Sequence, residues 1–239
     1  MRAFCGFVPR AMGTKLDFVT LGTGSGPAQE LWDSVLVELR TLESILDRFN
    51  PSGEVFRLNA SLSAATFRKS RELEKVISLC EDYRIRTGGL FDVKAGGKYD
   101  FGGFAKGYFL KKCLEMLRKA GVGDAFVNFG NSTILGLGKN PAGEPWSVDL
   151  MDPYSGNPVK RIVLEDAALS TSGNTPGYSG HTIDPRTGLG VSDHRLAVAL
   201  GSDPLDSEVL STAAMAGGPG SLPVLREAFP FTRIEIHTL

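Results

Sequence analysis

The strongest constraint on the fold is the order in which helical and strand-like patterns follow one another along the chain. A strand is predicted over residues 15–21, and an amphipathic helix follows over residues 28–49. The apolar residues of that helix are three and four positions apart, which places them on one face: Leu31, Val35, Leu39, Leu42, Leu46 and Phe49. Two further helices are predicted over residues 70–86 and 104–120.

Short strand-like runs dominate the rest of the chain. They are expected at residues 125–129, 133–137, 146–151, 161–164, 195–200 and 232–237, with a short helix at 207–216. Because helices and strands gather in runs instead of alternating strictly, the pattern predicts an α+β fold with a mixed or antiparallel sheet and flanking helices. A doubly wound parallel sheet is not favoured.

Length and composition are those of one globular domain. The chain has 239 residues, of which 42% are apolar and 22% are charged, so we expect a single domain over residues 1–239 without a linker. A net charge of −1 gives no electrostatic reason to expect nucleic acid as a partner. No window approaches the ~18 consecutive apolar residues that span a bilayer, so no membrane insertion is expected. The sequence leaves the oligomeric state open.

The cysteines indicate a reducing compartment. Cys5, Cys80 and Cys113 are odd in number and widely spaced, which favours neither a disulfide framework nor a zinc knuckle. Cys80 and Cys113 lie on the apolar faces of predicted helices and are interpreted as core residues. Residues 1–10 lack the apolar run of a signal peptide. We therefore expect a cytoplasmic protein, with an exported protein whose signal has been removed as the alternative.

Two glycine-rich turns are possible phosphate sites. Residues 22–26 (GTGSG) join a strand to a helix, as a dinucleotide-binding turn does, but Pro27 occupies the third fingerprint position and no second strand follows within ~30 residues. A plain turn is the better interpretation. Residues 100–107 (DFGGFAKG) lead into a helix with Lys106 in its first turn. Helix N–H groups and the lysine charge favour a bound phosphate; a flexible turn with a solvated lysine is the alternative.

A second polar segment is residues 181–188 (HTIDPRTG). It brings His181, Asp184 and Arg186 into one turn that a proline and a glycine fix. Either the segment is functional, or Asp184 caps its own backbone and pairs with Arg186. His181 has more polar neighbours than the other two histidines, which favours a functional role for it.

Glu208 and Thr212 are a possible magnesium pair. Residues four apart share a helix face, so the carboxylate and the hydroxyl can point at one hard cation, which prefers oxygen ligands. The alternative is a solvated helix face.

Several blocks, taken in order, have counterparts in one protein family. They are residues 12–14 (MGT), 49–59 (FNPSGEVFRLN), 89–93 (GLFDV), 100–108 (DFGGFAKGY), 170–173 (STSG), 181–188 (HTIDPRTG) and 208–213 (EVLSTA). On these residues the chain resembles the ApbE-type FAD:protein FMN transferases, from about residue 11 to about residue 218.

The resemblance implies a flavin site in a cleft between two lobes. The implied FAD contacts are Met12, Phe49, Leu90, Phe91, Asp92, Asp100, Lys106 and Ile183. The resemblance also implies a Mg²⁺ ion held by the Glu208 carboxylate, the Thr212 hydroxyl and the backbone carbonyl of Gly103.

The activity that the resemblance implies is phosphoryl transfer. FMN moves from FAD to a threonine hydroxyl in a motif of an acceptor flavoprotein, and AMP leaves, with magnesium bridging the pyrophosphate. We expect His181 to act as general base or phosphate contact. Asp184 is expected to orient His181 or to help hold the metal site.

The chain departs from the family pattern at three places. Glu208 stands where the family has aspartate, and residues 127–132 (VNFGNS) lack one glycine and the carboxylate of V-N-x-G-G-D. Seven residues separate Asp92 from Asp100, where typical members insert several tens, so a more exposed flavin is expected. Two alternatives stay open: a non-catalytic FAD-binding protein, and a magnesium-dependent hydrolase that releases FMN and AMP.

Overall fold

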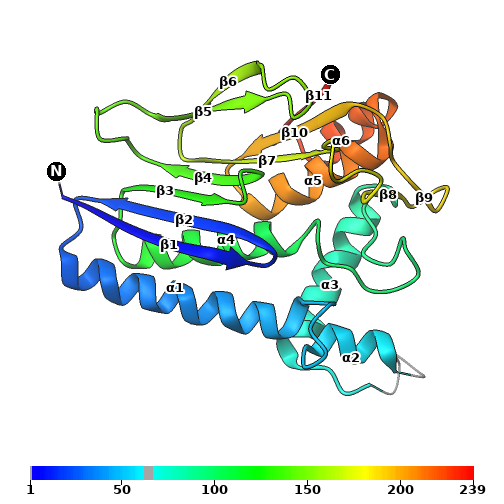
Figure 1. Cartoon of the computed structure of the whole chain (residues 1–239), viewed down its shortest axis with the longest axis horizontal. Coiled ribbons are helices and arrows are strands. Elements are labelled where there is room, and N and C mark those ends of the chain that lie inside the picture. Colours follow the sequence, from blue (N-terminus) through cyan, green and yellow to red (C-terminus); the bar gives the residue numbers. More distant parts are fainter. Residues whose placement is uncertain (1, 62–66) are drawn as a thin grey trace.

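The computed structural model describes residues 2–61 and 67–239, and Figure 1 shows its elements. The first half holds β1 (Ala3–Ala11), β2 (Thr14–Leu21), α1 (Ser25–Leu46), α2 (Glu54–Ala60), α3 (Arg71–Arg86), α4 (Ala105–Lys119), β3 (Asp124–Phe129) and β4 (Thr133–Leu137). The second half holds β5 (Trp146–Met151), β6 (Pro158–Leu164), β7 (Ala167–Gly173), β8 (Ile183–Asp184), β9 (Leu189–Gly190), β10 (Arg195–Gly201), α5 (Pro204–Gly217), α6 (Leu222–Ala228) and β11 (Arg233–Thr238).

One seven-stranded sheet organises the molecule, in the order β1-β2-β3-β4-β7-β10-β11. Every neighbouring pair in it is antiparallel. The structure therefore confirms the α+β prediction and resolves the sheet as antiparallel. The division into two lobes around a flavin cleft stays a prediction.

The sheet is covered on both faces, as Figure 1 shows, with α1, α4 and α5 on one face and the β5–β6 hairpin over the other. Side chains alternate between these faces along each strand. In β10, Ala197 and Ala199 join the larger core under the helices, whereas Leu196 and Val198 join the smaller core under the hairpin. The site lies on the helical face, where α5 crosses β7 and β10.

The helices follow the predicted pattern with shifted ends. α1 begins and ends three residues earlier than predicted, so the prediction that Phe49 belongs to its buried face is wrong: that ring is 76% exposed. The Asp47 side chain accepts a hydrogen bond from the Phe49 amide at 2.8 Å and turns the chain, and Asn50 precedes a proline, which disfavours helix. No sequence pattern predicted β1, α2, β7 or α6, nor the two-residue strands β8 and β9.

The glycine-rich segment at residues 22–26 forms a plain turn, as predicted, but the turn is residues 22–24 only, because Ser25 and Gly26 already belong to α1. It links β2, which pairs antiparallel with both neighbours, to α1. Cys80 and Cys113 are buried, as predicted, and Cys5 is exposed. In the described residues, no helix is long and apolar enough to cross a bilayer.

Candidate active site

Two glycines of the α4 segment let α5 approach closely. A β-carbon on Gly107 would lie 2.4 Å from Cβ of Glu208, and one on Gly103 would lie 2.7 Å from Oγ1 of Thr212. Both distances are shorter than van der Waals contact, so only glycine fits without movement. This approach places Gly103 against Thr212. It also brings Lys106, which lies in the first turn of α4, to Glu208.

Glu208 is the buried charge of the site. Its side chain is 3% exposed, and Oε1 lies 2.6 Å from Nζ of Lys106, which is itself 20% exposed. Its other oxygen, Oε2, accepts hydrogen bonds from the hydroxyls of Thr133 at 2.5 Å and Ser170 at 2.8 Å. A buried carboxylate needs both a counter-charge and hydrogen bonds to be tolerated. Lys106 supplies the charge, and the hydroxyls supply the hydrogen bonds.

The three predicted metal ligands lie together and offer only oxygen. The Thr212 hydroxyl donates to the backbone carbonyl of Glu208 at 3.1 Å, which leaves its oxygen lone pairs for a cation. Within the described ranges no group of three or more His, Cys, Asp and Glu side chains could hold a metal. One carboxylate, one hydroxyl and the Gly103 carbonyl suit a hard ion such as Mg²⁺, which completes its shell with waters or substrate phosphates.

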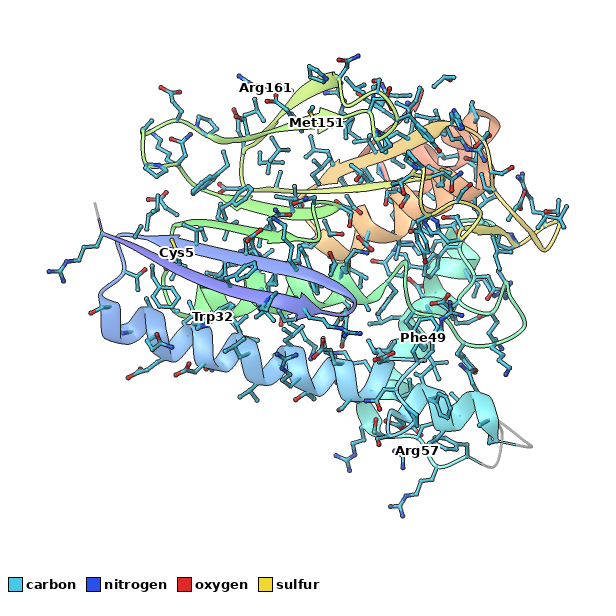
Figure 2. All side chains as sticks on the ribbon, viewed as in Figure 1. Cys5, Trp32, Phe49, Arg57, Met151 and Arg161 are labelled. Atoms are coloured by element: carbon cyan, nitrogen blue, oxygen red, sulfur yellow. The ribbon has the colours of Figure 1, made fainter. Side chains whose placement is uncertain are left out.

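The segment before α4 forms the next part of the site. Asp100 accepts a hydrogen bond from the Gly102 amide at 2.9 Å and pairs with Arg48 at 3.2 Å. The Arg48 guanidinium lies over the exposed Phe49 ring, 4.5 Å from its centre; Figure 2 shows Phe49 beyond the C-terminal end of α1. Arg48 therefore contacts both Asp100 and Phe49, and in this way connects two predicted site residues.

His181 lies on the rim of the site. Its ring stacks on the exposed Tyr178 ring, with 4.1 Å between the ring centres. Loss of water around the ring and, secondly, the positive charge of Lys106 lower the pKa of His181, while the charge of Asp100 raises it. The imidazole is thus within electrostatic range of both groups and favours its neutral form.

Asp184 is engaged locally. Its two carboxylate oxygens accept hydrogen bonds from Arg186 at 2.9 and 2.8 Å, and Oδ1 also accepts the Arg186 amide. These hydrogen bonds lower the pKa of Asp184. The arrangement matches the structural alternative from the sequence, while the catalytic role of Asp184 stays a prediction.

Of the remaining predicted flavin contacts, Ile183 lies against a loop, and Leu90 and Phe91 lie in the core. Ile183 reaches the short loop between Asp92 and Asp100, where a β-carbon on Gly96 would lie 3.1 Å from its Cδ1. Leu90 and Phe91 are 7% and 3% exposed, so they belong to the core, and their flavin contacts stay predictions.

Met12 and Asp92 shape turns. Met12 has a φ of 44° at the tip of the β1–β2 hairpin, and its amide donates to the Glu43 carboxylate at 2.8 Å. Asp92 accepts the Lys94 amide at 2.7 Å. Their flavin contacts stay predictions.

Sequence patterns did not predict the hydroxyl groups that contact Glu208 from the sheet. Ser170 and Ser172 both contact the Ser211 hydroxyl, at 3.0 and 2.9 Å, and Thr133 contacts Glu208 itself. The available signal was the spacing of two in the STS run, which places Ser170 and Ser172 on one face of a strand.

A depression of about 580 Å³ lies away from the site, between the β5–β6 turn and β11, and contains none of the predicted site residues.

One curated protein and several solved structures are similar to this chain. The chain is 24% identical to the FAD:protein FMN transferase of Rhodobacter capsulatus over 270 aligned positions, covering 88% of this chain and 51% of that protein. The chain therefore spans about half the length of this curated relative.

Solved structures show the same fold. The flavin transferase ApbE of Vibrio cholerae superposes with a TM-score of 0.83 at 19% identity, covering 98% of this chain and 92% of that one. The apo flavinyl transferase ApbE of Pseudomonas stutzeri gives 0.80 at 22% identity, covering 98% and 89%. The ApbE protein of Thermotoga maritima gives 0.83 at 17% identity, covering 99% and 97%. The ApbE family model matches residues 12–99 and 93–230, that is, most of the sheet and the whole of the site, and the chain belongs to the ApbE family.

Proposed function

We propose that this protein transfers FMN from FAD to the hydroxyl of a threonine on an acceptor flavoprotein, releases AMP and requires Mg²⁺. One observation carries the proposal: Lys106 of α4, Glu208 and Thr212 of α5, and Gly103 of the turn before α4 converge at one point. Cleavage of a pyrophosphate requires a positively charged side chain that binds phosphate, here Lys106, beside a metal site made of oxygen ligands.

FAD binding is assigned to the start of α4 and to the loops around it. Lys106 and the first amides of α4 offer positive charge to the pyrophosphate. The exposed ring of Phe49, with Arg48 above it, offers a flat surface for a ring system of FAD. The short loop after Asp92 leaves the flavin more open to solvent than a longer insertion would.

The metal would be held by Glu208, Thr212 and the carbonyl of Gly103. A Mg²⁺ ion bound there supplies positive charge to the pyrophosphate oxygens during transfer. Lys106 adds a second positive charge on the same side, since it already faces Glu208 at 2.6 Å.

The attacking hydroxyl loses its proton to His181 in this proposal. The lowered pKa of His181 keeps its imidazole neutral near pH 7, the form that accepts a proton. The threonine oxygen forms a bond to the phosphorus on the FMN side of FAD. The bond from that phosphorus to the bridging oxygen breaks, and the oxygen leaves with AMP.

The test is incubation of the protein with FAD, with and without MgCl₂, and with and without a peptide that carries a threonine in the family's acceptor motif. AMP is measured by chromatography, and the peptide mass is checked for one FMN adduct. We expect AMP and adduct in equal amounts, only when magnesium and peptide are both present. The Glu208→Gln variant, which keeps the shape of the side chain, should lose both products.

Each alternative gives a different result. Magnesium-dependent AMP without an adduct, with several threonine peptides, would identify a hydrolase. FAD that binds and stays intact would identify a non-catalytic binder. Adduct formation in the presence of excess EDTA, or undiminished adduct from Glu208→Gln, would refute the metal assignment.

A further inference from the structure

Two buried hydroxyls lie under Glu208, and the sheet register places them there. Thr133 is the first residue of β4, and Ser170 is its direct partner in β7. Residues opposite each other in an antiparallel pair project from the same face. Both are essentially unexposed, at 0% and 1%, on the face that α5 covers.

Both hydroxyls bind the same oxygen of Glu208. Thr133 Oγ1 and Ser170 Oγ lie 2.5 and 2.8 Å from Oε2, whereas Lys106 Nζ lies 2.6 Å from Oε1. A carboxylate accepts hydrogen bonds on both oxygens. The two oxygens thus have different partners: Oε2 is bound to two residues of the sheet, and Oε1 pairs with Lys106 of α4.

We propose that Thr133 and Ser170 are positioning residues that fix Glu208 through Oε2, so that only Oε1 is presented to a cation. The cation part rests on the proposed function. A carboxylate whose second oxygen is saturated acts as a one-oxygen ligand. Glu208 has one more methylene, and so one more rotatable bond, than an aspartate, and the two hydroxyls remove that freedom.

The serine chain behind Ser170 supports its orientation. The Ser211 hydroxyl lies 3.0 Å from Ser170 Oγ and 2.9 Å from Ser172 Oγ. The Ser211 hydroxyl also donates to the backbone carbonyl of Glu208 at 3.0 Å. Because an ionised carboxylate oxygen only accepts hydrogen bonds, Ser170 donates its one proton to Oε2 of Glu208.

The experiment compares Thr133→Val, Ser170→Ala and the double variant with the unmodified protein. Binding of MnCl₂ alone, without FAD or acceptor, is measured by the electron paramagnetic resonance signal of free Mn²⁺. We expect each single variant to weaken Mn²⁺ binding about threefold and the double variant tenfold or more. Thr133→Ser, which restores the hydroxyl, should bind Mn²⁺ as the unmodified protein does.

Ser207→Ala is the matched control. Ser207 is also fully buried on α5 and directly precedes Glu208, but its hydroxyl binds the backbone carbonyls of Ala168 and Asp203 at 3.0 and 3.1 Å. Loss of this hydroxyl should leave Mn²⁺ binding unchanged. An equal loss of Mn²⁺ affinity in Ser207→Ala would show that any buried hydroxyl matters and would overturn the positioning role.

Crystal structures of the unmodified protein and the variants give a second readout that needs no metal. We expect Glu208 to change its side-chain torsions in the double variant, or in Thr133→Val if the double variant does not fold. An unmoved Glu208, or Mn²⁺ affinity within twofold of the unmodified protein, overturns the proposal. If the unmodified protein binds Mn²⁺ but forms no adduct, the transferase proposal fails alone. If it binds no Mn²⁺, the metal assignment fails, and the crystal structures decide the positioning role.

Discussion

Replacing Gly107 by alanine tests the close approach of α4 and α5 on which the site depends. The added β-carbon would lie 2.4 Å from Cβ of Glu208, 2.8 Å from the carbonyl oxygen of Pro204 and 3.1 Å from Cα of Leu205. Two of these three atoms belong to the backbone and cannot rotate away. The helices must therefore move apart, and Glu208 moves with them.

The expected loss of stability is the difference of two effects. Alanine in place of glycine inside a helix gains about 1 kcal/mol from propensity. Overpacking a close contact costs about 1–3 kcal/mol, and backbone contacts belong at the upper end of that range. The net effect is a destabilisation of about 2 kcal/mol, which lowers the melting temperature by roughly 4–8 °C for a chain of this size.

The assay is thermal unfolding followed by circular dichroism, with Gly26→Ala as the matched control. Gly26 also lies in the first turn of a helix, α1, but a β-carbon there would meet nothing within 4 Å. Its replacement should raise or keep the melting temperature, since only the propensity effect remains. A Gly107→Ala variant at least as stable as the unmodified protein would refute the close packing and, with it, the geometry described around Glu208.

Three further predictions concern single side chains. Lys106→Met should weaken FAD binding about tenfold or more, because a charged hydrogen-bond donor contributes ~1.5–3 kcal/mol, and an unchanged dissociation constant in a flavin fluorescence titration would contradict this. Because the pKa of His181 lies below its ordinary value of about 6.5, its imidazole stays neutral at pH 6.5 and above. The rate of transfer should therefore decline only below pH 6.5, and this decline should be absent in His181→Gln. A decline in rate centred above pH 6.5 would argue against His181 as the base. Iodoacetamide at neutral pH should modify the exposed Cys5 in the folded protein but reach Cys80 and Cys113 only after unfolding, since burial raises the pKa of both thiols. Mass spectrometry after a short reaction counts the modified thiols. Three modified thiols in the folded protein would contradict the burial of Cys80 and Cys113.

The helices and most strands could be predicted because their side chains carry a clear period. The apolar residues of α1 and α4 repeat every three or four positions, and β4 to β6 hold apolar and β-branched residues. β7 carried no such signal. Its sequence AALSTSG holds mostly small residues, on which α5 packs directly, and the hydroxyl of Ser170 binds Glu208.

Local spacing indicates only those parts of the site whose residues are adjacent in sequence or one helical turn apart, whereas Gly103 was joined to Glu208 and Thr212 only through the family resemblance. Glu208 with Thr212, and Lys106 with its glycines, meet that condition. The pairing of Lys106 with Glu208 does not, since it depends on how closely α4 and α5 approach. Thr133 could not be predicted as part of the site, because its role follows from the register of β4 against β7, which no local pattern reveals.

The hydrogen bonds of Glu208 also determine when during synthesis the site can form. Its partners Lys106, Thr133 and Ser170 lie 102, 75 and 38 residues earlier in the chain. During synthesis, Lys106, Thr133 and Ser170 thus emerge from the ribosome well before Glu208, whose carboxylate binds all three. Contacts of such long separation close late in folding. An incomplete nascent chain therefore cannot assemble this centre, which forms only after α5 has joined the sheet.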